Sequence, residues 1–213
     1  MFVDIHSHKL QYETNIGILN FPFNHTPIPN QYFSASIHPW DINKETINKL
    51  SCFKDLLHDT NCIAIGEVGF DKNYLSYWKE QILIFDEILK INKAYNKPLI
   101  IHCVKAFNEL FETIKRHNNK ATIIIHGFSK NEQVLNDVLK KGFYVSLGTT
   151  VFKESFYKVV KKVPLDKLFL ETDNSNYTIE QVYQQVCDIC QVEIEILKSQ
   201  ILKNFKIVFI NEY

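Results

Sequence analysis

Short apolar runs alternate with longer amphipathic stretches along the whole chain, and this pattern limits the possible folds more than any other feature. The runs are rich in β-branched residues and are flanked by polar residues or glycine, as the strands of a buried parallel sheet are. Parallel strands need a crossover connection, usually a helix. The pattern therefore predicts repeated β-α units with strands at residues 2–5, 16–20, 32–37, 62–66, 99–102, 122–126, 142–146 and 168–171.

Eight strands with helices between them predict an α/β fold, a compact (β/α)8 TIM-type barrel formed by one domain over residues 1–213. The predicted helices are residues 74–96, 106–118, 131–141, 152–160, 179–190 and 193–209. Residues 8–31 contain three prolines and little helical pattern, so we expect the first helices of the barrel to be shortened or replaced by loop. A doubly wound open sheet is the alternative fold.

The charge of the chain argues against a protein that coats nucleic acid. Lys+Arg and Asp+Glu balance at 24 each, and Arg116 is the only arginine, so the planar guanidinium clamp on a phosphate is scarce. The sequence opens directly on a strand pattern without a secretory signal, and we expect a cytoplasmic protein. Cys187 and Cys190 form a C-x-x-C on a predicted helix, and without a second pair we interpret them as packing thiols.

Several predicted strands end in a residue type that binds metals. The carboxyl ends of barrel strands are where active sites assemble. Strands far apart in the sequence meet there, so we expect their end residues to converge. These residues are His6, His8, Glu67, His102, His126 and Asp173.

The four histidines predict a site for two divalent ions. His6 and His8 are two apart on a strand and point to the same side, which suits two imidazoles on one ion. His102 and His126 end two other strands and can hold a second ion. A mixture of imidazoles and carboxylates suits Zn²⁺, Mn²⁺ or Mg²⁺ rather than a thiolate-bound ion.

Two carboxylates complete this predicted site. Glu67 can offer one oxygen to each ion, which suits a bridging role and would fix the spacing of the ions. Asp173 can bind a metal and can also orient or deprotonate the attacking water. The predicted chemistry is hydrolysis by a hydroxide that two metal ions activate, with Glu67 and Asp173 as the catalytic carboxylates.

Three further histidines, His25, His58 and His117, sit in polar or loop-like sequence, and we interpret them as ordinary polar residues. Each of the six residues named above would, taken alone, deserve the same interpretation. Their shared position at strand ends favours a site over that interpretation.

Lysines and aromatic residues near the strand ends are candidates for substrate contact. Lys72, Lys105 and Lys130 each follow a ligand-bearing strand end by a few residues, and we predict that they contact a substrate phosphate, Lys105 foremost. Trp40 and Phe128 could stack on a base, but aromatic residues beside apolar strands are more often part of the core. We therefore predict core positions for both.

Six short motifs occur in a fixed order along nearly the whole chain. They read DIHSH, IHPW, GEVGFD, IHC, IHGFS and LETD at residues 4–8, 37–40, 66–71, 101–103, 125–129 and 170–173. This series resembles the TatD family of metal-dependent hydrolases, which belongs to the wider amidohydrolase-like barrels. One such motif would be weak, whereas six in order are highly specific.

The resemblance implies hydrolysis of DNA phosphodiesters, often from a 3′ end, with divalent metals and DNA as the substrate partner. It implies the metal role for the same six residues and places His38 near the site as a catalytic residue that contacts the substrate phosphate. The chain departs from the family pattern at Val104 and Lys105, where the family commonly has an arginine and an acid. It departs again at Asn174 and Ser175, where the family has a small residue and a proline. These departures bear on the choice of substrate.

Two other functions remain open on the sequence. The same metal site could hydrolyse a small ester, amide or phosphate, because the fold alone does not choose the substrate. A non-catalytic barrel is the third possibility, and the presence of all six predicted ligand residues argues against it.

Overall fold

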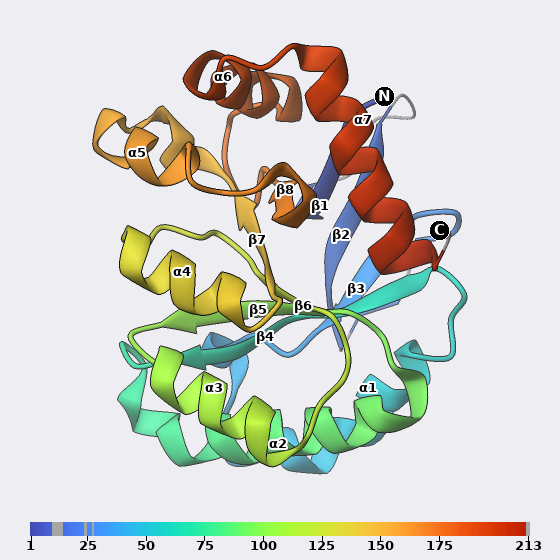
Figure 1. The fold of residues 1–213 in the computed structure, drawn as a ribbon. Helices are drawn as coiled ribbons and strands as arrows, with labels where there is room; N and C mark the ends of the chain where they lie inside the picture. The colour runs from blue at the N-terminus through green and yellow to red at the C-terminus, as the bar shows by residue number, and fades with distance from the viewer. Residues whose placement is uncertain (10–14, 24, 27, 212–213) are drawn as a thin grey trace. The chain divides into compact units, whose positions relative to one another are not determined.

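The computed structural model of the protein describes residues 1–213 apart from 10–14, 24, 27, 212 and 213. The strands follow one another in a single sheet in chain order, as Figure 1 shows, and every pairing given by register is parallel. Residue Ser7 of the first strand forms a parallel bridge to Asp173, which follows the last strand. The strands are β1 Val3–Ser7, β2 Ile16–Pro22, β3 Phe33–Ser36, β4 Cys62–Asp71, β5 Leu99–Val104, β6 Ile123–Ile125, β7 Tyr144–Leu147 and β8 Leu168–Leu170.

An unbroken order from β1 to β8 that returns to β1 is the topology of a (β/α)8 barrel. A doubly wound sheet would reverse its strand order at a switch point, so that alternative is wrong. All eight predicted strands are present, including residues 16–20, which extend to Pro22. In the described part of the β2–β3 connection there is no helix, as the prolines there predict. Most of the β1–β2 connection lies outside the described residues.

The predicted helices are confirmed with three changes. The helices are α1 Leu50–Leu56, α2 Trp78–Tyr95, α3 Phe107–Arg116, α4 Glu132–Lys140, α5 Tyr157–Val160, α6 Ile179–Cys190 and α7 Ile194–Phe205. Helix α1 is missing from the prediction. Residues 152–160 are largely 3₁₀ turns with only α5 helical, because two successive turns bury Val151 and Phe156, whose spacing does not fit one helical face. The predicted last helix ends as α7 at Phe205 and continues as a π-helix, Lys206–Ile210.

The chain divides into two compact units, and each is described by itself. The first unit comprises Met1–Leu19 and Ile124–Tyr213, and the second comprises Asn20–Ile123. The prediction of a single domain stays a prediction.

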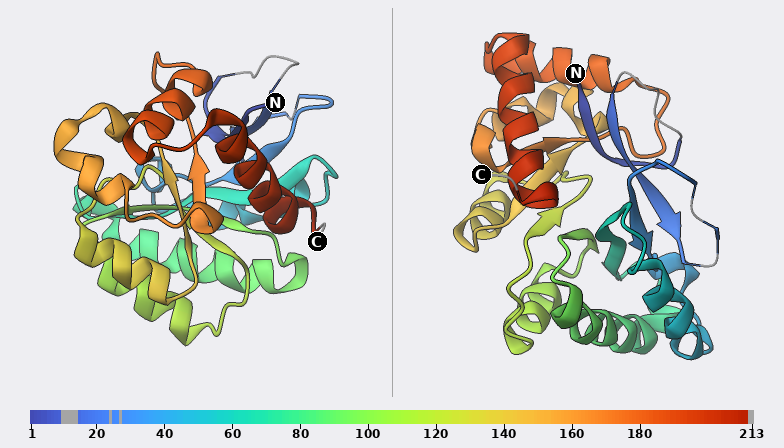
Figure 2. Two further views of the ribbon diagram at one scale, coloured as in Figure 1. Left: turned by 45° about the horizontal axis from the view of Figure 1, so that its top comes forward. Right: turned by 90° about the vertical axis from the view of Figure 1, so that its right-hand side faces the viewer.

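In the first unit, α7 packs on β8 and β1, and α6 packs on α7 and β8 (Figure 2). Tyr183 of α6 is fully buried, and its hydroxyl donates to the Val3 carbonyl and accepts from the Val3 N–H at 3.1 Å each. A buried phenol needs such partners, so this pair fixes α6 on the strand that leads to His6.

In the second unit, α2 packs on β4 and α3 on β5. Phe70 of β4 and Phe85 of α2 are buried, with ring centroids 5.0 Å apart in an edge-on arrangement. This packing holds the helix against the strand that carries Glu67.

Strand β4 is longer than predicted and runs through Glu67 to Asp71. Its register against β5 shifts between Ile65 and Val68, so β4 contains one more residue than its partner at Gly66–Glu67. The register of β1 against β2 shifts in the same way between Asp4 and Ser7. Such bulges turn side chains out of the regular alternation and are common beside active sites, and here they occur at His6 and Glu67.

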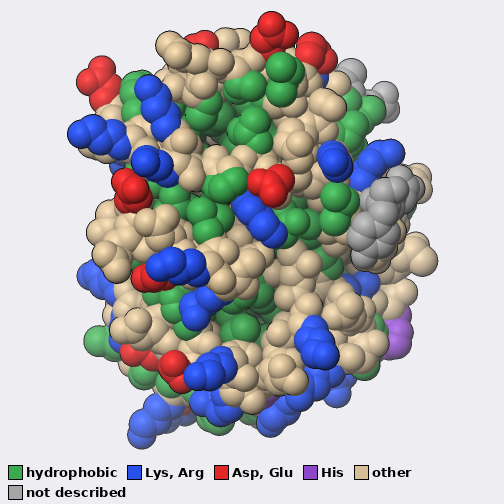
Figure 3. Space-filling model, viewed as in Figure 1, with side chains coloured by type: hydrophobic (Ala, Val, Ile, Leu, Met, Phe, Trp, Pro, Cys, Tyr) green, Lys and Arg blue, Asp and Glu red, His purple; other side chains and the backbone are tan. Residues whose placement is uncertain are grey.

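Two general properties of the chain are also visible. Among the residues that the structure describes, no helix is long and apolar enough to cross a membrane. Basic and acidic side chains are interspersed on the face drawn in Figure 3, in agreement with the balanced charge of the sequence.

Gly69 allows β4 to lie close to β5. Its φ is +139°, and a Cβ at this position would collide with the backbone carbonyl oxygen of His102. We expect Gly69→Ala to lower the free energy of unfolding by about 3 kcal/mol or more, through backbone strain and this collision.

Urea denaturation measures this effect. Gly142→Ala is the matched control, because Gly142 also has a positive φ but no atom within 4 Å of the added Cβ, and we expect it to cost about 1 kcal/mol. Equal costs for the two variants would show that the contact with β5 is not the constraint.

Candidate metal centres

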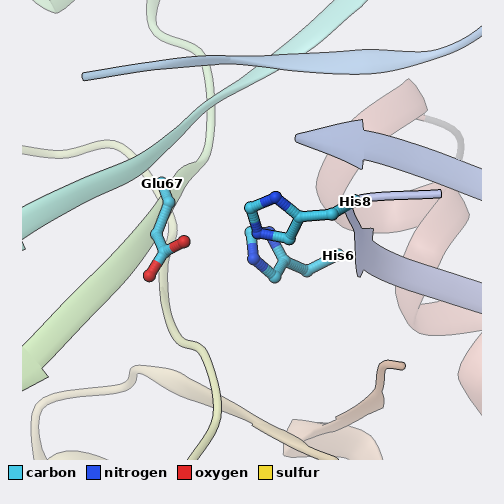
Figure 4. Close-up of side chains that lie close together, drawn as sticks. All are labelled: His6, His8 and Glu67. Atoms are coloured by element: carbon cyan, nitrogen blue, oxygen red, sulfur yellow. The ribbon is translucent and has the colours of Figure 1, made fainter. Parts of the chain in front are cut away.

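His6, His8 and Asp173 converge in the first unit. The Nε2 atoms of His6 and His8 lie 3.6 and 3.4 Å from the same atom, Oδ1 of Asp173. Figure 4 shows the two imidazoles beside each other at the end of β1. The ring of His126 lies 4.5 Å from that of His6, centroid to centroid. We call His6, His8, His126 and Asp173 the first cluster.

The backbone explains why Asp173 meets both histidines. The Asp173 N–H donates to the carbonyl of His6 at 2.9 Å, and the His8 N–H donates to the carbonyl of Asp173 at 3.1 Å. Asp173 is thus held between the two histidines, and its positive φ of 53°, which aspartate tolerates, turns the chain at this point.

Asp4 ties β1 to the residue before Asp173. Its Oδ2 accepts the Thr172 hydroxyl at 2.6 Å and its Oδ1 accepts the Thr172 N–H at 3.1 Å. The Asp4 side chain is fully buried, and this burial raises its pKa to about 7 in spite of the hydrogen bonds from Thr172.

His126 has a buried carboxylate behind it. Its Nδ1 lies 3.2 Å from Oε1 of Glu171, which also accepts the Gly127 N–H at 2.8 Å. Glu171 is fully buried, and its Oε2 has no hydrogen-bond partner in the described part of the chain. A carboxylate on Nδ1 fixes the tautomer and orientation of the ring and leaves Nε2 for a metal.

A second group of ligand atoms lies in the second unit. Oε1 of Glu67 is 3.1 Å from Nε2 of His38 and 2.6 Å from Nδ1 of His102. The backbone of Glu67 is fixed on both sides, because its N–H donates to Asn20 Oδ1 and its carbonyl accepts the Ser36 hydroxyl. We call His38, Glu67 and His102 the second cluster.

Asp71 supports the second cluster in the way that Glu171 supports His126. Its Oδ2 lies 3.1 Å from Nε2 of His102 and accepts the indole N–H of Trp40 at 2.8 Å. Burial alone would raise the pKa of Asp71, but hydrogen bonds from Trp40, Asn73 and His102 lower it below its ordinary value. The imidazole of His102 thus lies between two carboxylates, with Nε2 facing Asp71 and Nδ1 facing Glu67.

Asp173 is also ionised. Burial would raise its pKa, but the interactions with His6 and His8 and the charge of His126 outweigh this effect and lower the pKa well below its ordinary range. The first cluster therefore offers imidazoles and a carboxylate, the donor set that divalent ions of the zinc and manganese type take.

The residue types and the spacing of both clusters suit a divalent metal ion. Two ligand atoms that each lie about 2.1 Å from one ion are about 3.4 Å apart at a tetrahedral angle, close to the His–Asp173 distances of the first cluster. The ligand atoms of the second cluster all lie within 4.8 Å of one another. Nδ1 of His102 and Oε1 of Glu67 are at hydrogen-bonding distance.

The structure thus groups the predicted ligands by unit. His6, His8, His126 and Asp173 lie together, and Glu67 and His102 lie together with His38. The pairing of His102 with His126 and the bridging role of Glu67 stay predictions, as does the phosphate contact of His38.

The predicted lysine contacts have partners of their own. Lys72 Nζ pairs with Glu109 at 2.5 Å, and Lys105 Nζ donates to Asn73 Oδ1 at 2.9 Å. Lys130 is half-buried. Their contact with a substrate phosphate stays a prediction.

The two aromatic predictions have different outcomes. Phe128 is 1% exposed and lies in the core, as predicted. Trp40 is 55% exposed, so its predicted core position is wrong. The cause is the 3₁₀ turn Pro39–Asp41 that follows β3 and carries the indole away from the interior.

Sequence reasoning missed the supporting roles of Asp71 and Glu171, although both lie within the motifs. A signal was present, since Asp71 is the last residue of an apolar strand and Glu171 directly follows another. Buried carboxylates need partners, and the histidines at neighbouring strand ends are the partners available.

We expect Glu171→Gln to weaken divalent-metal binding by about ten- to a hundredfold, because the amide keeps the bond to Gly127 but loses the charge that orients His126. Titration of metal-free protein with Zn²⁺ against a competing chelator measures this. Glu180→Gln, at an exposed residue of α6, is the control and should bind as the unaltered protein does. Equal affinities for both variants would rule out the supporting role.

Comparisons with known proteins identify the family of the chain. A family model described as TatD related DNase matches residues 24–210. An uncharacterized metal-dependent hydrolase of Buchnera aphidicola is 31% identical over 67% of this chain and 58% of its own length. The uncharacterized metal-dependent hydrolase YjjV of Escherichia coli is 29% identical over 73% of this chain and 61% of its own length. The chain thus spans about six tenths of the length of these two relatives.

Solved structures share the fold. The crystal structure of the TatD homologue YjjV from Escherichia coli superposes with a TM-score of 0.83 and 22% identity, covering 100% of this chain and 98% of that one. A TatD family hydrolase of Entamoeba histolytica gives a TM-score of 0.72 at 16% identity, covering 86% and 76%. The family model begins after His8, whereas the similarity to YjjV covers β1 as well. The chain belongs to the TatD family.

Proposed function

We propose that the protein is a divalent-metal-dependent phosphodiesterase that hydrolyses DNA, with the 3′-exonuclease action that the family resemblance implies. The observation that carries the proposal is the convergence of two imidazoles on one Asp173 oxygen at the spacing of ligands around an ion. The names of the relatives, metal-dependent hydrolases, and of the family model, a DNase, support the same chemistry.

The first cluster would hold one ion, and the second cluster would hold another. A bound divalent ion supplies two things, a lowered pKa for a coordinated water and positive charge that offsets the negative charge developing on the phosphate. The ligand set suits Zn²⁺, Mn²⁺ or Mg²⁺.

The residues of the chain perform the remaining steps. Asp173 is ionised and accepts a proton from the attacking water, whose oxygen forms a bond to phosphorus while the ester bond to the leaving oxygen breaks. The leaving oxygen takes up a proton from solvent. Glu67, fixed through its backbone by Asn20 and Ser36, holds its carboxylate beside His38 and His102. His38 contacts the substrate phosphate.

A smaller substrate is the second candidate, and the cations of the chain favour it. Arg116 pairs with Asp86 on α2 at 2.6 Å, and Lys72 pairs with Glu109. A long polyanion is held largely through lysine and arginine contacts to its phosphates. A small ester, amide or phosphate on the same metal ligands needs fewer such contacts.

Glu67→Gln tests the proposed chemistry. We expect the variant to fold but to lose at least about a hundredfold in rate, because the amide removes the charge of a residue that contacts both His38 and the ligand His102. The measurement is cleavage of an end-labelled single-stranded DNA oligonucleotide with Mg²⁺ or Mn²⁺ and with EDTA. Laddering from one end gives the polarity of digestion.

The control is Glu112→Gln, at an exposed residue of α3, which should cleave normally. Most of the rate retained in Glu67→Gln would contradict the role of Glu67. No cleavage by unaltered protein that carries its metals would favour the small ester or amide.

Metal content tests the two clusters separately. We expect about two equivalents of divalent ion in the purified protein, and about one in either His8→Ala or His102→Ala, because each removes a ligand from one cluster only. Elemental analysis gives the number directly. His58→Ala, whose ring contacts Tyr95 instead, should retain both ions. Full metal content in both His8→Ala and His102→Ala would contradict the assignment of one ion to each cluster.

A further inference from the structure

An aromatic pair stands beside the second cluster and has no part in the chemistry proposed above. Trp40 stacks on Tyr74, with ring centroids 5.2 Å apart and an interplanar angle of 27°. Trp40 is 55% exposed and Tyr74 is 44% exposed. Tyr74 stacks on one face of the indole, and more than half of the Trp40 surface is still exposed to solvent. An exposed aromatic ring offers a π-face on which the ring of a ligand can stack.

Trp40 is fixed to the second cluster at two points. Its indole N–H donates to the same Asp71 oxygen that lies 3.1 Å from His102. Its backbone N–H donates to Nδ1 of His38 at 3.1 Å. The indole therefore cannot turn away without breaking a bond to a residue that contacts a ligand histidine, and its open face is preorganised.

The indole of Trp40 lies close to the histidine rings of the second cluster. The Trp40 ring lies 4.8 Å from the His38 ring and 6.2 Å from the His102 ring, centroid to centroid. The base of a nucleotide is separated from its phosphate by a sugar. A phosphate at the second cluster would thus bring the base of its own or the adjacent nucleotide to the indole.

The two lysines near the second cluster that could bind a phosphate already have partners. Lys72 is paired with Glu109 and Lys105 is bound to Asn73, and the single arginine of the chain pairs elsewhere. Stacking of a base on an aromatic ring supplies affinity that does not depend on cations and tolerates any base, because every base has a π-face.

We propose that Trp40, backed by Tyr74, is a stacking site for a nucleobase of the substrate whose phosphate lies at the second cluster. This inference rests on the proposed phosphodiesterase function and names the feature of the substrate that the site recognises. Asp71 is a positioning residue for the site, since it holds the indole and His102 with one oxygen.

Binding is tested first, without turnover. The chain has two tryptophans, and the ring of Trp78 packs against Phe70. Trp78→Phe therefore leaves Trp40 as the only indole. Thymidine 5′-monophosphate added to the Mn²⁺-loaded variant should shift or quench the Trp40 emission, and 2-deoxyribose 5-phosphate should change it at least about tenfold less. Equal effects of the two ligands, or no effect of either, would overturn the stacking site.

Kinetics give the second test. Trp40→Leu should lower kcat/KM about tenfold for an oligonucleotide with a normal terminal nucleotide and little for one with a terminal abasic nucleotide. Trp40→Phe keeps an aromatic face but loses the bond to Asp71, and should retain the preference for the base. Tyr77→Leu, at a residue 39% exposed in the same segment, is the matched control and should behave as the unaltered protein does.

The outcomes separate this inference from the proposed function. Cleavage of both oligonucleotides at equal rates by unaltered protein would leave the phosphodiesterase standing and overturn the base site. Absence of all cleavage would remove the phosphodiesterase, and the emission of Trp40 with thymidine 5′-monophosphate would then decide the base site alone. Equal metal content in all variants would show that the losses of rate and of emission change do not arise from a loss of bound metal.

Discussion

The pairing of β8 with β1 is the interaction on which the first cluster depends. Two backbone hydrogen bonds place Asp173 between His6 and His8, and Asp4 adds two more bonds to Thr172. These contacts join residues at opposite ends of the chain. The same hydrogen bonds that return the strand order to its start therefore assemble the ligands, so the fold and the site are stabilised or lost together.

Buried carboxylates behind the histidines are the second recurring feature. Glu171 supports His126 in the first unit, and Asp71 supports His102 in the second. Burial of a carboxylate is costly unless it is paired and hydrogen-bonded. Each of these two bonds a backbone N–H as well as an imidazole, so part of the cost is offset without the metal. A carboxylate on one ring nitrogen of a histidine also fixes the orientation of the imidazole, so that the other nitrogen can face a ligand.

The sequence predicted the eight strands and the residue types at their ends, because apolar periodicity and parallel topology are local and general properties. It did not predict the bulge at Glu67, since a one-residue shift depends on the partner strand, and Gly66 alone does not reveal it. The position of Trp40 also escaped prediction. Its neighbours suggested a core, whereas the turn after Pro39 and the hydrogen bond to Asp71 hold it at the surface.

These features together suggest a division of labour in substrate recognition. Nucleic-acid binding through phosphate contacts is strong but carries no information about the base, and it needs free cations. This chain has balanced charge and one arginine, and two lysines near the second cluster are already engaged. In the proposed function, the fixed indole of Trp40 would offer an alternative source of affinity close to the bond that is cleaved. An enzyme built in this way would favour a flexible end or single strand, because a base must leave its own stack to reach Trp40.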